Sequence, residues 1–175
     1  MTNIKENPAD LILCADGKTR PRWASRSHLC WNYVDQEWGR PPQNLSAVFE
    51  LLTLVVFQVG ITWHAVLSKR KGLRAAFAGF DTRKVAEFSE ADIERLVQDS
   101  NIFRNRRKIS ATIASARALI ALEDQGISFS TMLSHYLHGD AELIKDLKSR
   151  GFSHIGPTSI GIVKQSMGVP HQVVT

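Results

Sequence analysis

The chain has 175 residues, 43% hydrophobic and 22% charged, which suits one folded domain with a buried core and excludes wholesale disorder. Lys and Arg number 22 against 17 Asp and Glu, a formal net charge of +5 that admits an anionic partner such as nucleic acid without requiring one. Only two cysteines occur, Cys14 and Cys30, which excludes a disulfide scaffold or a four-cysteine zinc site and favours the reducing cytoplasm.

The N-terminal segment is polar and irregular. We expect residues 1–19 to form a flexible extension in front of one helical domain over residues 20–175. The segment lacks the apolar stretch of a signal peptide. A tryptophan-rich stretch follows, and Pro41 and Pro42 close it because proline does not fit inside a helix.

Helical patterns dominate the rest of the chain. Residues 45–59 are nearly all apolar, which predicts a helix buried on all sides that stops at Gly60. Its most apolar run is far shorter than the roughly 20 residues that span a bilayer, so no membrane partner is expected. Residues 104–123 place apolar side chains at helical spacing. Without any alternating strand pattern, the sequence predicts an all-α fold of about eight helices.

One helical corner has the pattern of a helix-hairpin-helix motif. Residues 148–158 read Lys-Ser-Arg-Gly-Phe-Ser-His-Ile-Gly-Pro-Thr, with Pro157 at the favoured first position of the second helix. Amides at that helix start can bind a phosphate, a contact that positions DNA without reading its sequence. An ordinary glycine-capped corner is the alternative. The predicted backbone-contacting residues are Gly151, Phe152, Gly156 and Thr158.

A basic cluster opens the long helix. Arg104, Arg106 and Lys108 lie within five residues, although cations oppose the dipole at a helix N-terminus. We predict that these three side chains contact the DNA backbone. A solvated surface is the simpler alternative for a charge cluster standing alone.

The aromatic residues are a third feature. Flat rings hold nucleobases by stacking, although packing in the core is the commoner role of a tryptophan. The rings concerned are Trp23, Trp31, Tyr33, Trp38 and Trp63.

Five collinear segments resemble the DNA-3-methyladenine glycosylase I family. They are residues 33–39 (Tyr-Val-Asp-Gln-Glu-Trp-Gly), 49–63 with Phe-Glu-Leu-Leu and Gln-Val-Gly-Ile-Thr-Trp, 77–81, 104–106, and the hairpin at 150–158. The resemblance covers about residues 20–171. It implies the helix-hairpin-helix glycosylase fold, a pocket for a flipped base and action on alkylated double-stranded DNA. We expect a monomer.

The same resemblance implies a base pocket. It aligns Tyr33 with a base-contacting tyrosine and Trp63 with the stacking tryptophan, and we include Trp23 and Trp38 in the pocket. Two positions depart from the family: Cys30 replaces a second base-contacting tyrosine, and Val55 replaces the base-reading glutamate. A cationic base would then be held mainly by ring faces.

The zinc ligands of the family are also replaced. Pro21 and Val34 stand where the first Cys and His are expected, and Thr175 stands where the last Cys is expected. His171 alone survives near the C-terminus, and one ligand cannot hold a tetrahedral zinc ion. We therefore expect no metal and no cofactor.

The resemblance leaves two main hypotheses open. The first is a monofunctional DNA N-glycosylase that excises N3-alkylated adenine. The base already carries positive charge and leaves with little help, so no catalytic residue is assigned. We expect Asp35, Glu37 and Glu50 to serve as structural partners of arginine or backbone. The second is a degenerate homologue that binds DNA or a damaged base without cleavage. A helical interaction protein that no longer binds DNA is a third, weaker reading.

Overall fold

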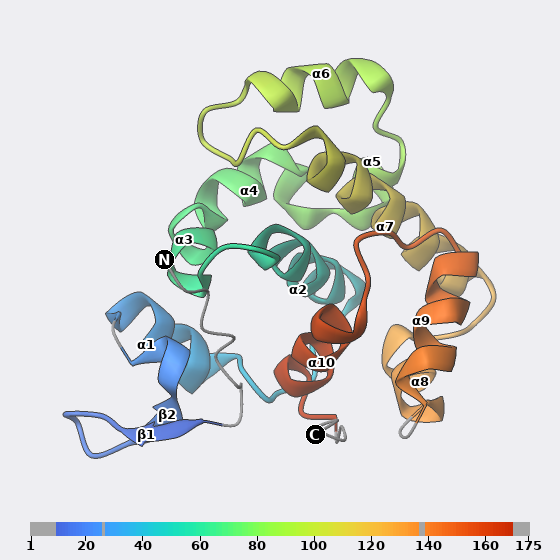
Figure 1. Cartoon of the computed structure of the whole chain (residues 1–175). Helices are drawn as coiled ribbons and strands as arrows, with labels where there is room; N and C mark the ends of the chain where they lie inside the picture. Colours follow the sequence, from blue (N-terminus) through green and yellow to red (C-terminus); the bar gives the residue numbers. More distant parts are fainter. Residues whose placement is uncertain (1–9, 26, 137–138, 170–175) are drawn as a thin grey trace.

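The computed structural model describes residues 10–25, 27–136 and 139–169. Within these ranges the chain forms ten α-helices, two short 3-10 helices and one two-stranded sheet (Figure 1). The elements in chain order are β1 (Leu11–Leu13), β2 (Thr19–Pro21), η1 (Arg22–Ala24), α1 (His28–Gln36), α2 (Leu45–Gln58), α3 (Trp63–Ser68), α4 (Arg70–Ala76), η2 (Ala78–Phe80), α5 (Thr82–Ala86), α6 (Glu90–Gln98), α7 (Arg106–Asp124), α8 (Phe129–His135), α9 (Asp140–Ser149) and α10 (Pro157–Ser166).

The mostly helical fold confirms the prediction, with more helices than the eight expected. One reason is a break at Lys69, which separates the two short helices α3 and α4. Another is α8, a seven-residue helix capped by Ser128, whose side chain accepts from the amide of Thr131. Short helices carry too few turns for their period to be read with assurance.

The expectation of no strands is wrong at the N-terminus. Strands β1 and β2 pair antiparallel, with Leu11 opposite Pro21 and Leu13 opposite Thr19. The turn between them uses Gly17, whose φ of 79° is easily adopted only by glycine. Three-residue strands are too short to show an alternating pattern. Residues 1–9 of the expected extension lie outside the described ranges.

Helix α2 is the centre of the molecule (Figure 1). Every residue from Val48 to Phe57 is buried, as the all-apolar stretch predicts. The helix begins at Asn44, whose side chain accepts from the amide of Ala47, and the chain turns at Gly60 with a φ of 83°. Helices α3, α7 and α10 pack against α2, so side chains from distant parts of the sequence meet around it.

The corner between α9 and α10 has the predicted geometry. Gly151 follows α9 with a φ of 97°, and Gly156 is the cap of α10, with Pro157 at its first position. No helix in the described ranges is both long and apolar enough to cross a membrane.

Candidate functional site

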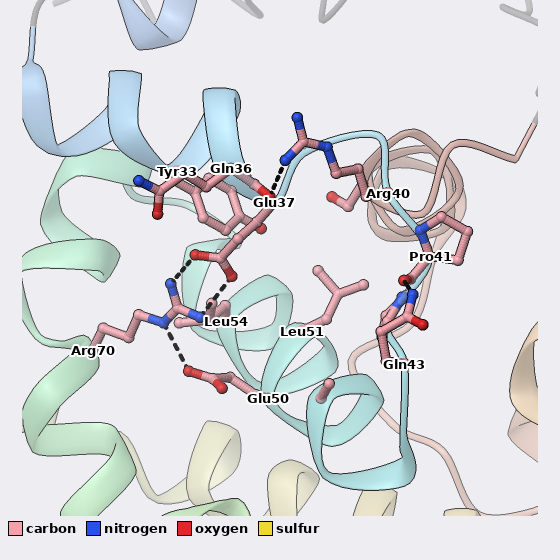
Figure 2. Close-up of a pocket in the computed structure, with 13 residues that line it drawn as sticks. Tyr33, Gln36, Glu37, Arg40, Pro41, Gln43, Glu50, Leu51, Leu54 and Arg70 are labelled. Carbon is pink, nitrogen blue, oxygen red and sulfur yellow. Dashed lines mark hydrogen bonds and ion pairs between the residues drawn. The ribbon is translucent and has the colours of Figure 1, made fainter.

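The candidate site is a pocket of about 310 Å³ between α1, the loop after it, α2, α4 and the end of α10 (Figure 2). Pockets of about 300–1,000 Å³ suit small organic ligands. Its wall combines apolar and charged side chains. The residues used below are Tyr33, Glu37, Glu50, Leu54, Arg70 and Ser166.

One wall of the pocket is an ion-pair network centred on Arg70 (Figure 2). Its guanidinium donates to both carboxylate oxygens of Glu37, at 2.6 and 2.7 Å, and to Oε1 of Glu50 at 2.7 Å. Arg74 donates to both oxygens of Glu50. The expectation that these two acids are partners of arginine is confirmed. Because both carboxylates are engaged by cations, neither is placed as a free general base.

Tyr33 is the predicted base-contacting residue that lines this pocket. Its ring stacks on Trp63 with centroids 5.2 Å apart, and the Arg70 guanidinium lies 5.8 Å from the ring centroid. Burial raises the pKa of Tyr33 far above its ordinary value. The phenol therefore stays protonated at neutral pH and is available as a hydrogen-bond donor.

The tryptophans predicted for the base site form one cluster with Tyr33. Trp23 lies 5.0 Å from Trp38 and 5.5 Å from Trp63, and Trp38 lies 5.6 Å from Trp63. The structure therefore brings these four rings together, and of the four only Tyr33 lines the pocket. Because Tyr33 and Trp63 stack directly on each other, the structure leaves no space for a base between the two rings.

Cys30 and Val55 are buried in the core. Burial raises the pKa of the Cys30 thiol, which makes it a poor nucleophile. Val55 does not line the pocket, whereas its neighbour Leu54 does. Both replacements therefore extend the apolar packing around the site, and direct contact of either with a base is an untested prediction.

Arg70 and Ser166 are among the pocket residues that the sequence analysis did not single out. Arg70 carries a signal that could have been found, because Arg70 and Arg74 are four residues apart and share a helix face. Ser166 carries none, because its place in the wall depends on how α10 docks. Its hydroxyl is among three buried side-chain groups that have no hydrogen-bond partner within the described ranges, the others belonging to Trp31 and Thr82.

A second hollow of about 380 Å³ lies between the start of α2, the end of α7 and α8. Its wall includes Val48, Leu119, Phe129 and the carboxylate of Glu123. It contains none of the predicted base-contacting residues. The pocket beside Tyr33 is therefore the better candidate for a polar, planar ligand.

The residues at the replaced zinc positions do not fit a metal. Pro21 and Val34 offer no side-chain ligand, and no three His, Cys, Asp or Glu side chains of the described ranges gather in a metal-binding group. His171 and Thr175 lie outside those ranges. A buried arginine lies beside the two positions instead. Arg20 pairs with Asp16 and Asp35, at distances of 2.7–2.8 Å.

This arginine ties the hairpin to α1. Arg20 is only 2% exposed, and its guanidinium stacks 4.6 Å from the Trp31 ring. Both carboxylates engage it through two oxygens, which is the strongest geometry for such pairs. The hydrogen bonds from Arg20 and Lys18 lower the pKa of Asp35 to about 2.

The predicted DNA-contacting residues fall into two groups. Gly151, Thr158 and Arg104 are exposed, and Gly156 lies at the start of α10. The other three have structural roles. Phe152 is buried, Arg106 pairs with Glu90 and Glu94, and the Lys108 ammonium donates to the carbonyl oxygens of Phe57 and Val59 at the end of α2.

Comparison with known proteins identifies the family. The methyladenine glycosylase model matches residues 23–143. DNA-3-methyladenine glycosylase 1 of Escherichia coli K12 is 36% identical over 84% of this chain and 89% of its own length. The Haemophilus influenzae DNA-3-methyladenine glycosylase is 32% identical, over 86% of this chain and 92% of its own.

Solved structures agree with these relatives. A crystal structure of 3-methyladenine DNA glycosylase I superposes with a TM-score of 0.79 at 34% identity, covering 85% of this chain and 92% of that one. The enzyme from Staphylococcus aureus gives a TM-score of 0.76 at 29% identity, covering 90% of each chain. Together with the shared sequence segments, these matches show that the chain belongs to the methyladenine glycosylase family.

Proposed function

We propose that this protein is a monofunctional DNA N-glycosylase that removes N3-alkylated adenine from double-stranded DNA. Its relatives bear the name DNA-3-methyladenine glycosylase. The observation that carries the proposal is Tyr33, which is protonated in the wall of a pocket of suitable size. We further propose that it acts as a monomer in the cytoplasm.

Cleavage of the glycosidic bond of an N3-alkylated adenine needs little catalytic help from the protein. An N3-alkylated adenine is cationic while attached to the sugar, so breaking the glycosidic bond sends the electron pair to the base, which leaves neutral. Water then adds to the anomeric carbon of the sugar, in the place that the base has left, and gives up a proton to the solvent. A strong general acid is not required, and a pocket that desolvates and holds the flipped nucleotide is sufficient. This agrees with Glu37 and Glu50 being bound to Arg70 rather than free.

Tyr33 supplies a hydrogen-bond donor that can stabilise the departing base. Its phenol donates a hydrogen bond to a ring nitrogen of the departing base, where electron density grows during bond breakage. The start of α10, where Thr158 is exposed, and the exposed Arg104 side chain bind the DNA backbone. These contacts hold the duplex while the nucleotide is flipped.

The test is release of free base from N-methylated duplex DNA, identified by mass spectrometry. We expect the wild type to release 3-methyladenine and Tyr33→Phe to release it more slowly. Tyr33→Phe is sharper than Trp63→Ala, because removing a buried tryptophan costs about 3–5 kcal/mol of stability. No release above a buffer control, from folded protein that binds DNA, would replace this proposal with the binding-only alternative.

A further inference from the structure

Ser166, the last residue of α10, carries a hydroxyl that the fold does not use. Ser166 lines the pocket, yet it is only 3% exposed and its Oγ has no hydrogen-bond partner within the described ranges. A buried hydroxyl without a partner destabilises a fold. Such a group calls for a role outside stability, because alanine at this place would carry no such penalty.

The backbone holds Ser166 at a fixed place. The amide of Gly39, in the loop after α1, donates to the Ser166 carbonyl at 2.9 Å. Two residues on, Gly168 lies so close that an added Cβ would stand 2.4 Å from the Gly39 carbonyl oxygen. The end of α10 and the loop beside Tyr33 are therefore locked together, and the hydroxyl keeps its place in the wall.

The nearest functional neighbour of this hydroxyl is the phenol of Tyr33. Both residues line the pocket. The Ser166 side chain acts to lower the pKa of the Tyr33 phenol, against the dominant effect of burial, which raises it. A phenol O–H favours two orientations in the plane of the ring, so a neighbour is needed to select one of them. A donor placed at the phenol oxygen occupies one lone pair and leaves the proton to point elsewhere.

We propose that Ser166 is a positioning residue for Tyr33: when a base enters the pocket, the unpaired Ser166 hydroxyl donates to the phenol oxygen and turns the phenol proton toward an acceptor nitrogen of that base. The inference rests on the proposed function, because it assumes a nucleobase in this pocket. It assigns the pocket a preference for bases that present a bare ring nitrogen to Tyr33. A base that presents an N–H at this place meets a donor and is disfavoured.

The test is a double-mutant cycle with Ser166→Ala, Tyr33→Phe and the combined variant. Affinity for free 3-methyladenine is measured by calorimetry, and base release from methylated DNA is measured under single-turnover conditions. We expect Ser166→Ala to weaken binding and slow release by about threefold to tenfold, the usual effect of one neutral hydrogen bond. In the Tyr33→Phe background the same change should have no effect.

Thermal unfolding separates positioning from a structural role. Ser166→Ala should leave the Tm unchanged or raise it, since it removes an unpaired polar group. Thr82→Val is the matched control, because Thr82 also has a buried hydroxyl without a partner and does not line the pocket. It should leave the Tm unchanged or raise it too, with base affinity as in the wild type.

The outcomes are distinguishable. Wild-type affinity and release in Ser166→Ala overturn the inference while the glycosylase function stands. An equal loss in the Tyr33→Phe background also overturns it, because Ser166 would then act without Tyr33. A wild type that binds the base but releases none refutes the function alone, and calorimetry still decides the inference. A wild type that does neither overturns both.

Discussion

Two glycines test how closely α10 is locked to the site. Gly168 and Gly126 both have left-handed backbone, with φ of 67° and 73°. An added Cβ on Gly126 would meet nothing within 4 Å, whereas on Gly168 it would stand 2.4 Å from the Gly39 carbonyl oxygen. Substituting each with alanine therefore separates the backbone cost from the cost of the contact.

The magnitudes follow from that geometry. Alanine in left-handed backbone costs about 1–2 kcal/mol at either position. At Gly168 the Gly39 carbonyl must also retreat by about 1 Å, from 2.4 Å to the 3.4 Å of an ordinary contact. Such overpacking adds about 1–3 kcal/mol. The retreat also strains the hydrogen bond from the Gly39 amide to Ser166. Gly168→Ala should thus lose about 1–3 kcal/mol more than Gly126→Ala.

The assay is chemical denaturation of both variants, together with binding of 3-methyladenine. Each kcal/mol corresponds to about 2–4 °C in Tm for a domain of this size, so heating gives a second measure. Binding should weaken in Gly168→Ala alone, because only that change displaces the wall around Ser166. Equal losses of stability in the two variants would refute the close backbone contact.

Three further predictions concern charges. Lys164 is fully buried and pairs with a carboxylate, so Lys164→Ala should cost about 2–4 kcal/mol in denaturation and Lys164→Met much less; equal losses would contradict this. Pairing with arginine lowers the pKa of Asp35 to about 2, so the stability that the Asp35 carboxylate adds is present above about pH 4 and is lost as pH falls through about 2. The Tm of the wild type should therefore exceed that of Asp35→Asn by less and less as pH falls from 5 to 2. A constant difference in Tm would count against this pairing. Arg104→Ala should weaken DNA binding and reduce the slope of log binding constant against log salt concentration by about 0.9. Arg106 is already paired with two acids, so Arg106→Ala should change that slope less. A larger effect of Arg106→Ala than of Arg104→Ala in salt titrations would exclude the assigned roles.

Local signals predicted much of the fold. The all-apolar stretch gave α2 within a residue, and the cap at Asn105, whose side chain accepts from the Lys108 amide, marks the start of α7 close to the predicted residue 104. The corner from Gly151 to Pro157 was equally readable. In each case the information lies within a few neighbouring residues.

The site was harder to predict because it depends on docking between distant elements. The aromatic content singled out Tyr33 and Trp63 only among five rings, and their specific roles toward a base came from the resemblance to a family. Ser166 reaches the wall from 133 positions after Tyr33, and nothing in the composition of α10 marks it. The two strands were missed because three residues are too few to show an alternating pattern, and the ion pair between Arg20 and Asp35 that ties them to α1 joins residues far apart in the sequence.

The charged residues show that composition does not determine role. Of the basic cluster predicted to bind DNA, Arg104 is exposed, and within the described part of the chain no ion pair or hydrogen bond engages it. The Lys108 ammonium group donates hydrogen bonds to the carbonyl oxygens of Phe57 and Val59 at the end of α2, and burial lowers its pKa. A positive charge at a helix start is thus explained by a neighbouring helix end that lacks partners for its carbonyls.

The most direct test of the account is a crystal structure of the protein soaked with 3-methyladenine. The account predicts the base in the pocket beside Tyr33, with one ring nitrogen within hydrogen-bond distance of the phenol. Density for the base only in the second hollow, between α2 and α7, would contradict the assignment of the site.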